Sequence, residues 1–387
     1  MRWPTAFELA TGLVQGMDPD AVHLPPPTPD PATTPLAALE ASVLPALRRP
    51  PCVLSFSGGL DSSLVLAVAT RVARREELPD PVPVTWRFRG APRAEESSWQ
   101  DEVIGALGLR GTWQVLTADD DLDLVGPVAG RFLHRYGLRH PLNLHLHLPI
   151  VELAAGGSLL TGVGGDQVLA GWRRPDPESV PAYLRRAAGR ARARLLGGQR
   201  SGTEVFPWLR PEAAQEILGT HRAEQRAEPD RLADRIAWHL RRRDLRMTMA
   251  SFGLVAGDHD VMVGHPLLDA GFVAALVGWA GRRRRPPRAE LLAGIAAGEL
   301  PAVVVAPRAK AHFLEVFLRA PTREFVRGWD GGGVDADVVD PGRLRAVWAR
   351  WPVPECTSGL VQHLWLRQHP PAQSVRPARS GGAEVLS

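Results

Sequence analysis

Short apolar runs alternate with amphipathic stretches along the first half of the chain. Four runs have the length and the boundaries of buried strands: 52–56, 82–88, 113–116 and 158–161. Three stretches between them have apolar residues at helical spacing: 62–75, 97–107 and 124–136. Because strand and helix alternate, we expect an α/β fold, with a parallel sheet that carries helices on both faces.

The second half of the chain lacks this alternation and is expected to be mainly helical. Proline breaks after residue 174 lead into an arginine- and alanine-rich helical stretch that ends near Leu196. A longer helical pattern covers 230–249, and two more helices follow Asp269 and precede Pro301. We expect these helices to pack on or beside the sheet.

Proline-rich segments set the predicted boundaries. Residues 19–50 read as a leader or linker, and we expect the tail after Pro370 to be disordered. The predicted organisation has three parts: an N-terminal segment and linker (1–45), a central domain (46–330, with an α/β core over 46–175 and a helical part over 176–330), and a C-terminal extension (331–387).

The composition narrows the class of protein. No stretch approaches the ~18 consecutive apolar residues of a membrane span, and the N-terminus lacks a signal-peptide pattern, so we expect no membrane association and a cytoplasmic location. Cys52 and Cys356 are far apart, which fits a reducing compartment and argues against structural zinc. The net charge is only +4. We interpret arginine clusters such as 241–243 and 282–285 as solvated helix faces, which argues against a nucleic-acid partner.

Lys310 is the single lysine among 46 basic residues, the other 45 being arginines. A GC-rich genome that replaces lysine wherever charge alone is needed explains this ratio. A position that keeps its lysine is then a candidate for chemistry that needs a compact ammonium rather than a planar guanidinium.

The segment Ser57–Ser63 (SGGLDSS) lies between a predicted strand and a predicted helix. Its glycines, Gly58 and Gly59, let the backbone turn tightly and bring N–H groups close to an anion, while the serines, Ser57, Ser62 and Ser63, add hydroxyl donors. This is the pattern of a pyrophosphate cradle. Asp61 beside phosphates indicates a shared Mg²⁺. The alternative is an ordinary glycine turn in which Ser62 caps the helix.

A second glycine-rich segment, Leu160–Gln167, also follows a predicted strand. It places Asp166 at the carboxyl end of that strand. Because the carboxyl ends of parallel strands lie at one edge of a sheet, Asp61 and Asp166 are predicted to share one Mg²⁺. The alternative is that Asp166 merely caps a helix.

The first segment resembles the SGGxDSS loop of the asparagine synthetases, GMP synthetases and several tRNA-modifying enzymes. The second narrows the choice, because Thr161–Asp166 followed by Ala170–Trp172 is similar to the S-G-(E/D)-G-(G/S)-D-E-x-x-G-G-Y motif of the asparagine synthetases. The resemblance covers roughly residues 45–320.

Further pieces follow in that family's order. Arg243–Ala250 resembles its D-R-x-S-M-A helix, and His265–Asp269 resembles its V-P-F-L-D turn. Leu300 with Pro301, and then Arg308–Phe313, are similar to its L-P and R-x-K-x-x-F elements. The fold that the resemblance implies is that of the adenine nucleotide alpha hydrolases.

The resemblance also implies a reaction. The family's synthetase domain uses ATP and Mg²⁺ to convert a carboxylate into an acyl-adenylate with release of pyrophosphate, and ammonia or an amine then attacks to give an amide. By position, Ser57–Ser63 would hold pyrophosphate, Asp61 and Asp166 the metal, and Lys310 the charge that develops during reaction. Backbone contacts to the nucleotide are implied at four positions: Phe56, Phe88, Thr161 and Gly162. The expected partners are a small-molecule or peptide carboxylate and an amine donor, or a separate glutaminase that supplies ammonia.

Three departures from the family's pattern leave alternatives open. Residue 2 is arginine rather than the cysteine nucleophile of a glutaminase domain, and too few residues precede the loop for such a domain, so we expect no glutamine hydrolysis by this chain. Val163 and Gln167 replace an acid or tyrosine and a second acid, which removes a group that would assist proton transfer from the amine. The charged pair before His265 is replaced by 262–264, and 258–260 (Asp-His-Asp) or His265 could substitute.

The sequence is therefore compatible with asparagine synthesis and with a specialised amide-forming enzyme like those that close β-lactam rings or lasso peptides. A non-catalytic ATP-binding homologue that acts as a partner subunit is the alternative from another class. A tRNA-modifying adenylating enzyme is disfavoured by the absence of cysteine pairs.

Overall fold

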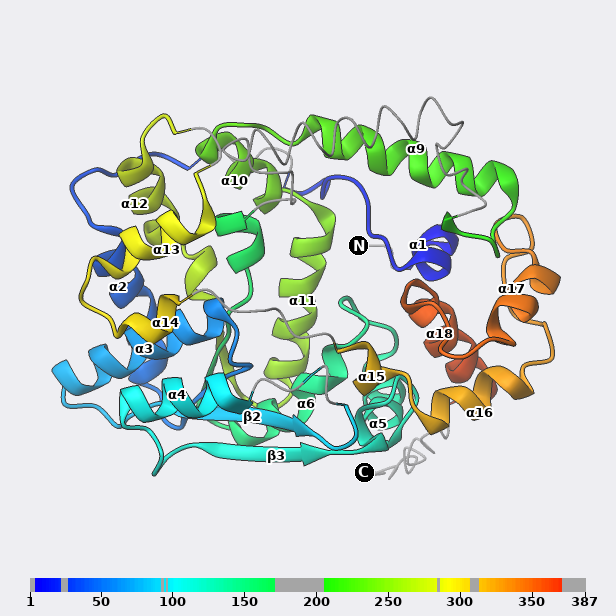
Figure 1. Cartoon of the computed structure of the whole chain (residues 1–387), viewed down its shortest axis with the longest axis horizontal. Coiled ribbons are helices and arrows are strands. Elements are labelled where there is room, and N and C mark those ends of the chain that lie inside the picture. Colours follow the sequence, from blue (N-terminus) through cyan, green and yellow to red (C-terminus); the bar gives the residue numbers. More distant parts are fainter. Residues whose placement is uncertain are drawn as a thin grey trace, which may run out of the picture.

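The computed structural model describes residues 4–21, 27–91, 94, 97–170, 205–283, 286–306 and 313–370 (Figure 1). Lys310, the arginine- and alanine-rich stretch before Leu196 and the tail after Pro370 lie outside the described residues.

Within the described residues, five parallel strands form one sheet: β1 (Cys52–Ser55), β2 (Val82–Phe88), β3 (Gln114–Ala118), β4 (Ser158–Leu160) and β5 (Met262–Gly264). Their order is β3-β2-β1-β4-β5, so β1 is central. Val53 in β1 lies opposite Val82 in β2 and Leu159 in β4. The loops that follow β1 and β4 are therefore neighbours at one edge of the sheet.

Alternate side chains of β1 enter two different cores. Cys52 and Leu54 belong to a core on one face, and Val53 belongs to a core on the other. Helices over the first face include α2 (Pro35–Leu47), α3 (Leu60–Arg75), α4 (Ser97–Leu107), α10 (Leu232–Leu240), α12 (Ala270–Ala280), α13 (Arg288–Ala296) and α14 (Ala302–Val305). Those over the second include α5 (Pro127–Tyr136), α6 (Leu148–Leu153) and α11 (Arg243–Gly257). The predicted α/β class with helices on both faces is confirmed.

A third core joins segments from both ends of the chain. Its helices include α1 (Ala6–Thr11), α9 (Pro211–Ala227), α15 (Leu314–Phe317), α16 (Ala320–Gly328), α17 (Pro341–Trp348) and α18 (Ser358–Gln368). In Figure 1, α1 lies beside α18. The buried indole of Trp208 donates from Nε1 to the carbonyl of Ala10 (2.8 Å), and Glu8 of α1 forms an ion pair with Arg243 of α11. The segment before residue 35 and the segment after residue 330 thus pack against each other.

Two secondary-structure predictions are wrong. The proline-rich stretch 19–50 contains helix α2, which begins at Pro35 after Thr34 caps it through Ala37 N (3.1 Å) and packs against α3 and α12. The helical pattern over 230–249 is two helices, α10 and α11, because the backbone is extended at Arg242 (φ −70°, ψ 142°).

No helix in the described part of the chain is both long and apolar enough to cross a membrane.

Candidate nucleotide-binding site

The loop after β1 forms a tight cradle at the start of α3. Phe56 N donates to Val84 O (2.9 Å), which holds the end of β1 against β2. Gly58 has a φ of 91°, in the left-handed region that favours glycine. Gly59 is the N-cap of α3 and has no side chain to bond the first backbone N–H groups of the helix. The positive end of α3 therefore faces the loop.

Serine side chains fix the shape of this loop. Ser57 Oγ accepts from Gly59 N (3.1 Å) and lies 3.1 Å from Ser62 Oγ, while Ser62 Oγ also lies 3.1 Å from Gly59 O. Ser63 is fully buried and its hydroxyl donates to the carbonyl of Gly58 (3.4 Å). Ser57 and Ser62 line the cavity in front of the loop, whereas Ser63 supports the loop from behind.

The loop after β4 lies directly against the loop after β1. A Cβ added to Gly162 would lie 2.9 Å from Ser62 N and 3.1 Å from Asp61 Cβ. A Cβ added to Gly165 would overlap the carboxylate of Asp61. Glycine at both positions is what allows the two segments to meet, and it brings Asp166 to the same side as Asp61.

Asp61 and Asp166 are joined by an arginine. Arg288, the first residue of α13, donates from Nη2 to Asp61 Oδ1 and from Nη1 to Asp166 Oδ1 (2.9 Å). Burial opposes the charge on Arg288, but the two carboxylates outweigh that effect and raise its pKa above the ordinary value. No motif in the sequence marks Arg288, which lies 227 residues after Asp61 in an arginine-rich chain.

These residues fit a magnesium nucleotide. The two carboxylates already share one cation, the guanidinium, and the uncapped start of α3 faces the cavity that they line. Among the described residues no three His, Cys, Asp or Glu side chains cluster as a metal site. A Mg²⁺ here would complete its shell with phosphate oxygens and water, as Mg²⁺ commonly does.

A cavity of about 560 Å³ lies in front of the two loops. Nine predicted site residues line it: Phe56, Ser57, Gly59, Asp61, Ser62, Phe88, Thr161, Gly162 and Asp166. The structure therefore brings together residues from β1, β2 and β4 that the sequence placed at one edge of the sheet. Val163 and Arg288 also line this cavity.

Two histidines lie close to this cavity. His265 Nδ1 is 2.7 Å from Thr161 Oγ1, and His147 Nδ1 is 3.3 Å from Ser55 Oγ. Burial lowers the pKa of each to about 4, so both rings are neutral near pH 7.

The other candidates near His265 lie elsewhere. Residues 258–260 precede β5 and therefore lie at the amino edge of the parallel sheet, opposite the cradle. Asp258 pairs with Arg135 (2.9 Å) and Asp260 pairs with Arg49 (2.8 Å). Of the four candidates, Asp258, His259, Asp260 and His265, the one that follows β5 is His265, and it therefore lies at the carboxyl edge of the sheet, on the side of the cradle.

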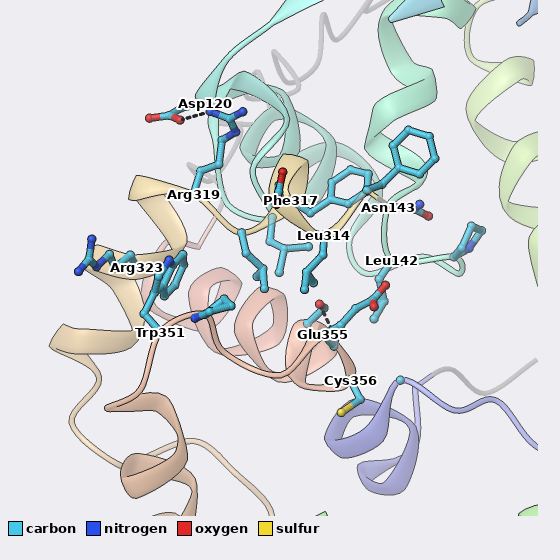
Figure 2. Close-up of a pocket in the computed structure, with 18 of the residues that line it drawn as sticks. Asp120, Leu142, Asn143, Leu314, Phe317, Arg319, Arg323, Trp351, Glu355 and Cys356 are labelled. Atoms are coloured by element: carbon cyan, nitrogen blue, oxygen red, sulfur yellow. Dashed lines mark hydrogen bonds and ion pairs between the residues drawn. The ribbon is translucent and has the colours of Figure 1, made fainter. Parts of the chain in front are cut away.

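A second and larger cavity, of about 1760 Å³, adjoins the first (Figure 2). Asn143, Phe313 and Phe317 line both. The wall of the larger cavity comes from the end of α1, the loop 140–143, α15, the start of α16 and residues 351–358. Apolar side chains dominate it, with Arg319 held by Asp119 (2.9 Å) and Arg323 lying over the ring of Trp351 at 5.8 Å.

The fold and this site define an α/β protein with two glycine-rich loops at the carboxyl ends of adjacent parallel strands. The chain belongs to the asparagine synthase family, whose model matches residues 36–367. The match extends beyond the region of the sequence motifs at both ends and includes α17 and all but the last residue of α18. Among curated proteins, none matches the chain. Family membership supports an ATP-dependent amidating ligase in general, and with it ATP as a substrate.

Proposed function

We propose that this chain forms an amide bond by adenylating a carboxylate with ATP. The carboxylate attacks the α-phosphorus, pyrophosphate leaves, and ammonia or an amine then displaces AMP from the acyl-adenylate. The observation that carries this proposal is the meeting of two loops at the carboxyl ends of β1 and β4, where Asp61 and Asp166 are drawn to one cation beside an anion cradle.

Each residue of the cradle has a role in this scheme. Ser57, Ser62 and the backbone of the SGGLDSS loop bind the β- and γ-phosphates that leave as pyrophosphate. Asp61 and Asp166 would hold Mg²⁺, which would neutralise part of the phosphate charge. Lys310, assigned from its position in the family motif, stabilises negative charge on the reacting groups.

The larger cavity is proposed to receive the carboxylate substrate. It lies beside the proposed nucleotide cavity, and Asn143, Phe313 and Phe317 line both. Its volume, about 1760 Å³, exceeds the roughly 300–1000 Å³ of sites for drug-sized ligands. This favours a carboxylate larger than aspartate, such as a peptide, and so a specialised amide-forming enzyme over asparagine synthesis. The amine is proposed to come from the substrate itself, from free ammonia or from a separate glutaminase.

Val163 favours a second candidate, a non-catalytic homologue that binds ATP. Its side chain lines the nucleotide cavity at the position where the family has an acid or tyrosine. Valine cannot accept a proton from an attacking amine. The neutral histidines His147 and His265 are near enough to the cavity to be candidates for that role.

The test is pyrophosphate exchange into ATP, measured with the full chain against a panel of carboxylates from aspartate to short peptides. We expect exchange with at least one peptide-sized carboxylate, its loss in Asp61→Ala, and a large reduction in Lys310→Arg. Asp80→Ala is the matched control, because Asp80 is also paired with an arginine, Arg74 (3.0 Å), but precedes β2 and so lies at the opposite edge of the sheet.

The outcomes separate the candidates. ATP binding without exchange on any carboxylate would support the non-catalytic homologue. Neither binding nor exchange would overturn the proposed function. Full exchange in Lys310→Arg would show that the lysine has no special role.

A further inference from the structure

Arg288 occupies the place in the site where the proposed function needs a metal ion. Its guanidinium bridges one oxygen of Asp61 and one oxygen of Asp166 and lines the nucleotide cavity. The side chain is about one quarter exposed, and its Nε is buried without a hydrogen-bond partner among the described residues. The two terminal nitrogens therefore carry the contacts.

Two carboxylates on adjacent loops repel each other unless a cation lies between them. Gly162 and Gly165 place the two loops in contact, which brings the side chains of Asp61 and Asp166 to the same side. The guanidinium supplies the positive charge, because its fork of N–H donors can serve two acceptors at once.

A divalent cation held by this site would need the same two carboxylates that Arg288 now bridges. The guanidinium and the metal therefore compete, and a metal that enters would repel the arginine. Phosphate oxygens are the other acceptors that a guanidinium binds with both terminal nitrogens. The pyrophosphate cradle lies next to the carboxylates in the same cavity, within the range of a long and rotatable side chain.

We propose that Arg288 is a counter-ion switch, which neutralises Asp61 and Asp166 before the nucleotide binds and then transfers to the phosphates of the magnesium nucleotide. The identity of the second partner rests on the proposed function, whereas the first contact is independent of it. Arg288 is on this basis a competitor of the metal for the carboxylates and a binding residue for the nucleotide.

The switch predicts effects of opposite sign on two affinities. In Arg288→Ala, Mn²⁺ alone, used as the probe for the divalent cation, should bind about tenfold more tightly, because its competitor is gone. The same variant should bind the magnesium complex of a non-hydrolysable ATP analogue about tenfold more weakly, because a phosphate contact is lost. Both constants are measured by titration calorimetry on the full chain, and Mn²⁺ binding is checked by electron paramagnetic resonance.

Arg283→Ala is the matched control. Arg283 pairs with Glu290 near the start of α13, so its removal also deletes an arginine–carboxylate pair without touching Asp61 or Asp166. We expect neither affinity to change in this control. Arg288→Gln tests the same prediction with a side chain of similar length if the alanine variant does not fold.

Several results would overturn the switch. Weaker binding of both Mn²⁺ and the nucleotide would mean that Arg288 only supports the shape of the loops, and unchanged affinities would mean that it does not compete. If the unmodified chain binds Mn²⁺ but no nucleotide, the proposed function fails, while tighter Mn²⁺ binding in the variant still establishes the competition.

Discussion

Replacement of Gly162 by alanine tests the contact between the two loops on which the whole site depends. The added Cβ would lie 2.9 Å from Ser62 N, whereas ordinary contacts begin at 3.4 Å. Ser62 is the third residue of α3, so its backbone cannot retreat by half an ångström without moving the helix. Gly162 does not have a positive φ, and steric overlap is therefore the main effect of the substitution.

The expected magnitude follows from overpacking. Forcing a methyl group into a closed contact typically costs about 1–3 kcal/mol. If the strain is relieved by spreading the loops, the cradle is lost, and the affinity for the magnesium nucleotide should fall by roughly tenfold to a hundredfold. If the loops stay in place, the strain should appear instead as a lower free energy of unfolding.

Urea unfolding and nucleotide titration on the same preparation distinguish the two cases. Gly219→Ala is the control, because Gly219 lies within α9 with nothing within 4 Å of its added Cβ. Alanine there should stabilise the fold by up to about 1 kcal/mol and leave nucleotide affinity unchanged. If Gly162→Ala retains both its unfolding midpoint and its nucleotide affinity, the close approach of the two loops is refuted.

Three further predictions concern stability. Burial lowers the pKa of His265 from 6.5 to about 4, so between these values the unfolded chain binds more protons than the folded chain. The contribution of neutral His265 to stability is therefore complete above about pH 6.5 and should fall on acidification by roughly 1.4 kcal/mol per pH unit. Urea midpoints of wild type and His265→Gln, measured across this window, should converge as the pH falls. Asp123 is fully buried and accepts from Thr322 Oγ1 (2.7 Å), which anchors the start of α16. Asp123→Ala should lower the free energy of unfolding, measured by urea titration, by about 2–4 kcal/mol, and a loss below about 0.5 kcal/mol would contradict this role. Arg242 is 2% exposed and donates to Glu224 Oε2 (3.1 Å). Arg242→Ala should therefore lower the free energy of unfolding, measured by thermal unfolding, by about 3 kcal/mol or more, because it leaves the Glu224 carboxylate without this partner. The double variant Arg242→Ala, Glu224→Gln should recover part of that loss.

The first half of the fold could be predicted from local pattern because strand and helix differ in period. The strand Cys52–Ser55 and the helix Leu60–Arg75 lie close to their expected places, since a fully buried run and an amphipathic stretch are distinct over a few residues. The strand β5 was not predicted. It has three residues, Met262–Gly264, and pairs through its backbone with β4, so its conformation depends on a neighbour about 100 residues earlier in the chain.

The two errors have separate physical causes. The start of α2 does carry a local signal, Thr34 as N-cap followed by Pro35 in the first turn, which the surrounding prolines obscured. The break between α10 and α11 has no such signal. It depends on Arg242, whose buried side chain pairs with Glu224 and lies over the ring of Trp238 at 4.7 Å, and these are contacts that a helical period does not record.

The candidate site divides in the same way. The proximity of Asp61 and Asp166 could be predicted, because each follows a strand and the topology of parallel sheets brings the carboxyl ends of neighbouring strands together. Arg288 could not, since arginine is common throughout this chain and nothing in the sequence near residue 288 marks it as different. The role of Lys310 remains a prediction from the family motif.

The bridge that Arg288 makes between the two loops also bears on when the complete site can form during synthesis. Asp61 precedes Arg288 by 227 residues, and Asp166 precedes it by 122. Contacts over such separations close late, because a long stretch of chain must be ordered before they form. In a nascent chain, Asp61 and Asp166 therefore lack Arg288 as a partner until α13 has emerged from the ribosome. Because nucleotide binding stabilises only the completed site, it shifts the equilibrium toward the folded chain after synthesis and does not assist the first steps of folding.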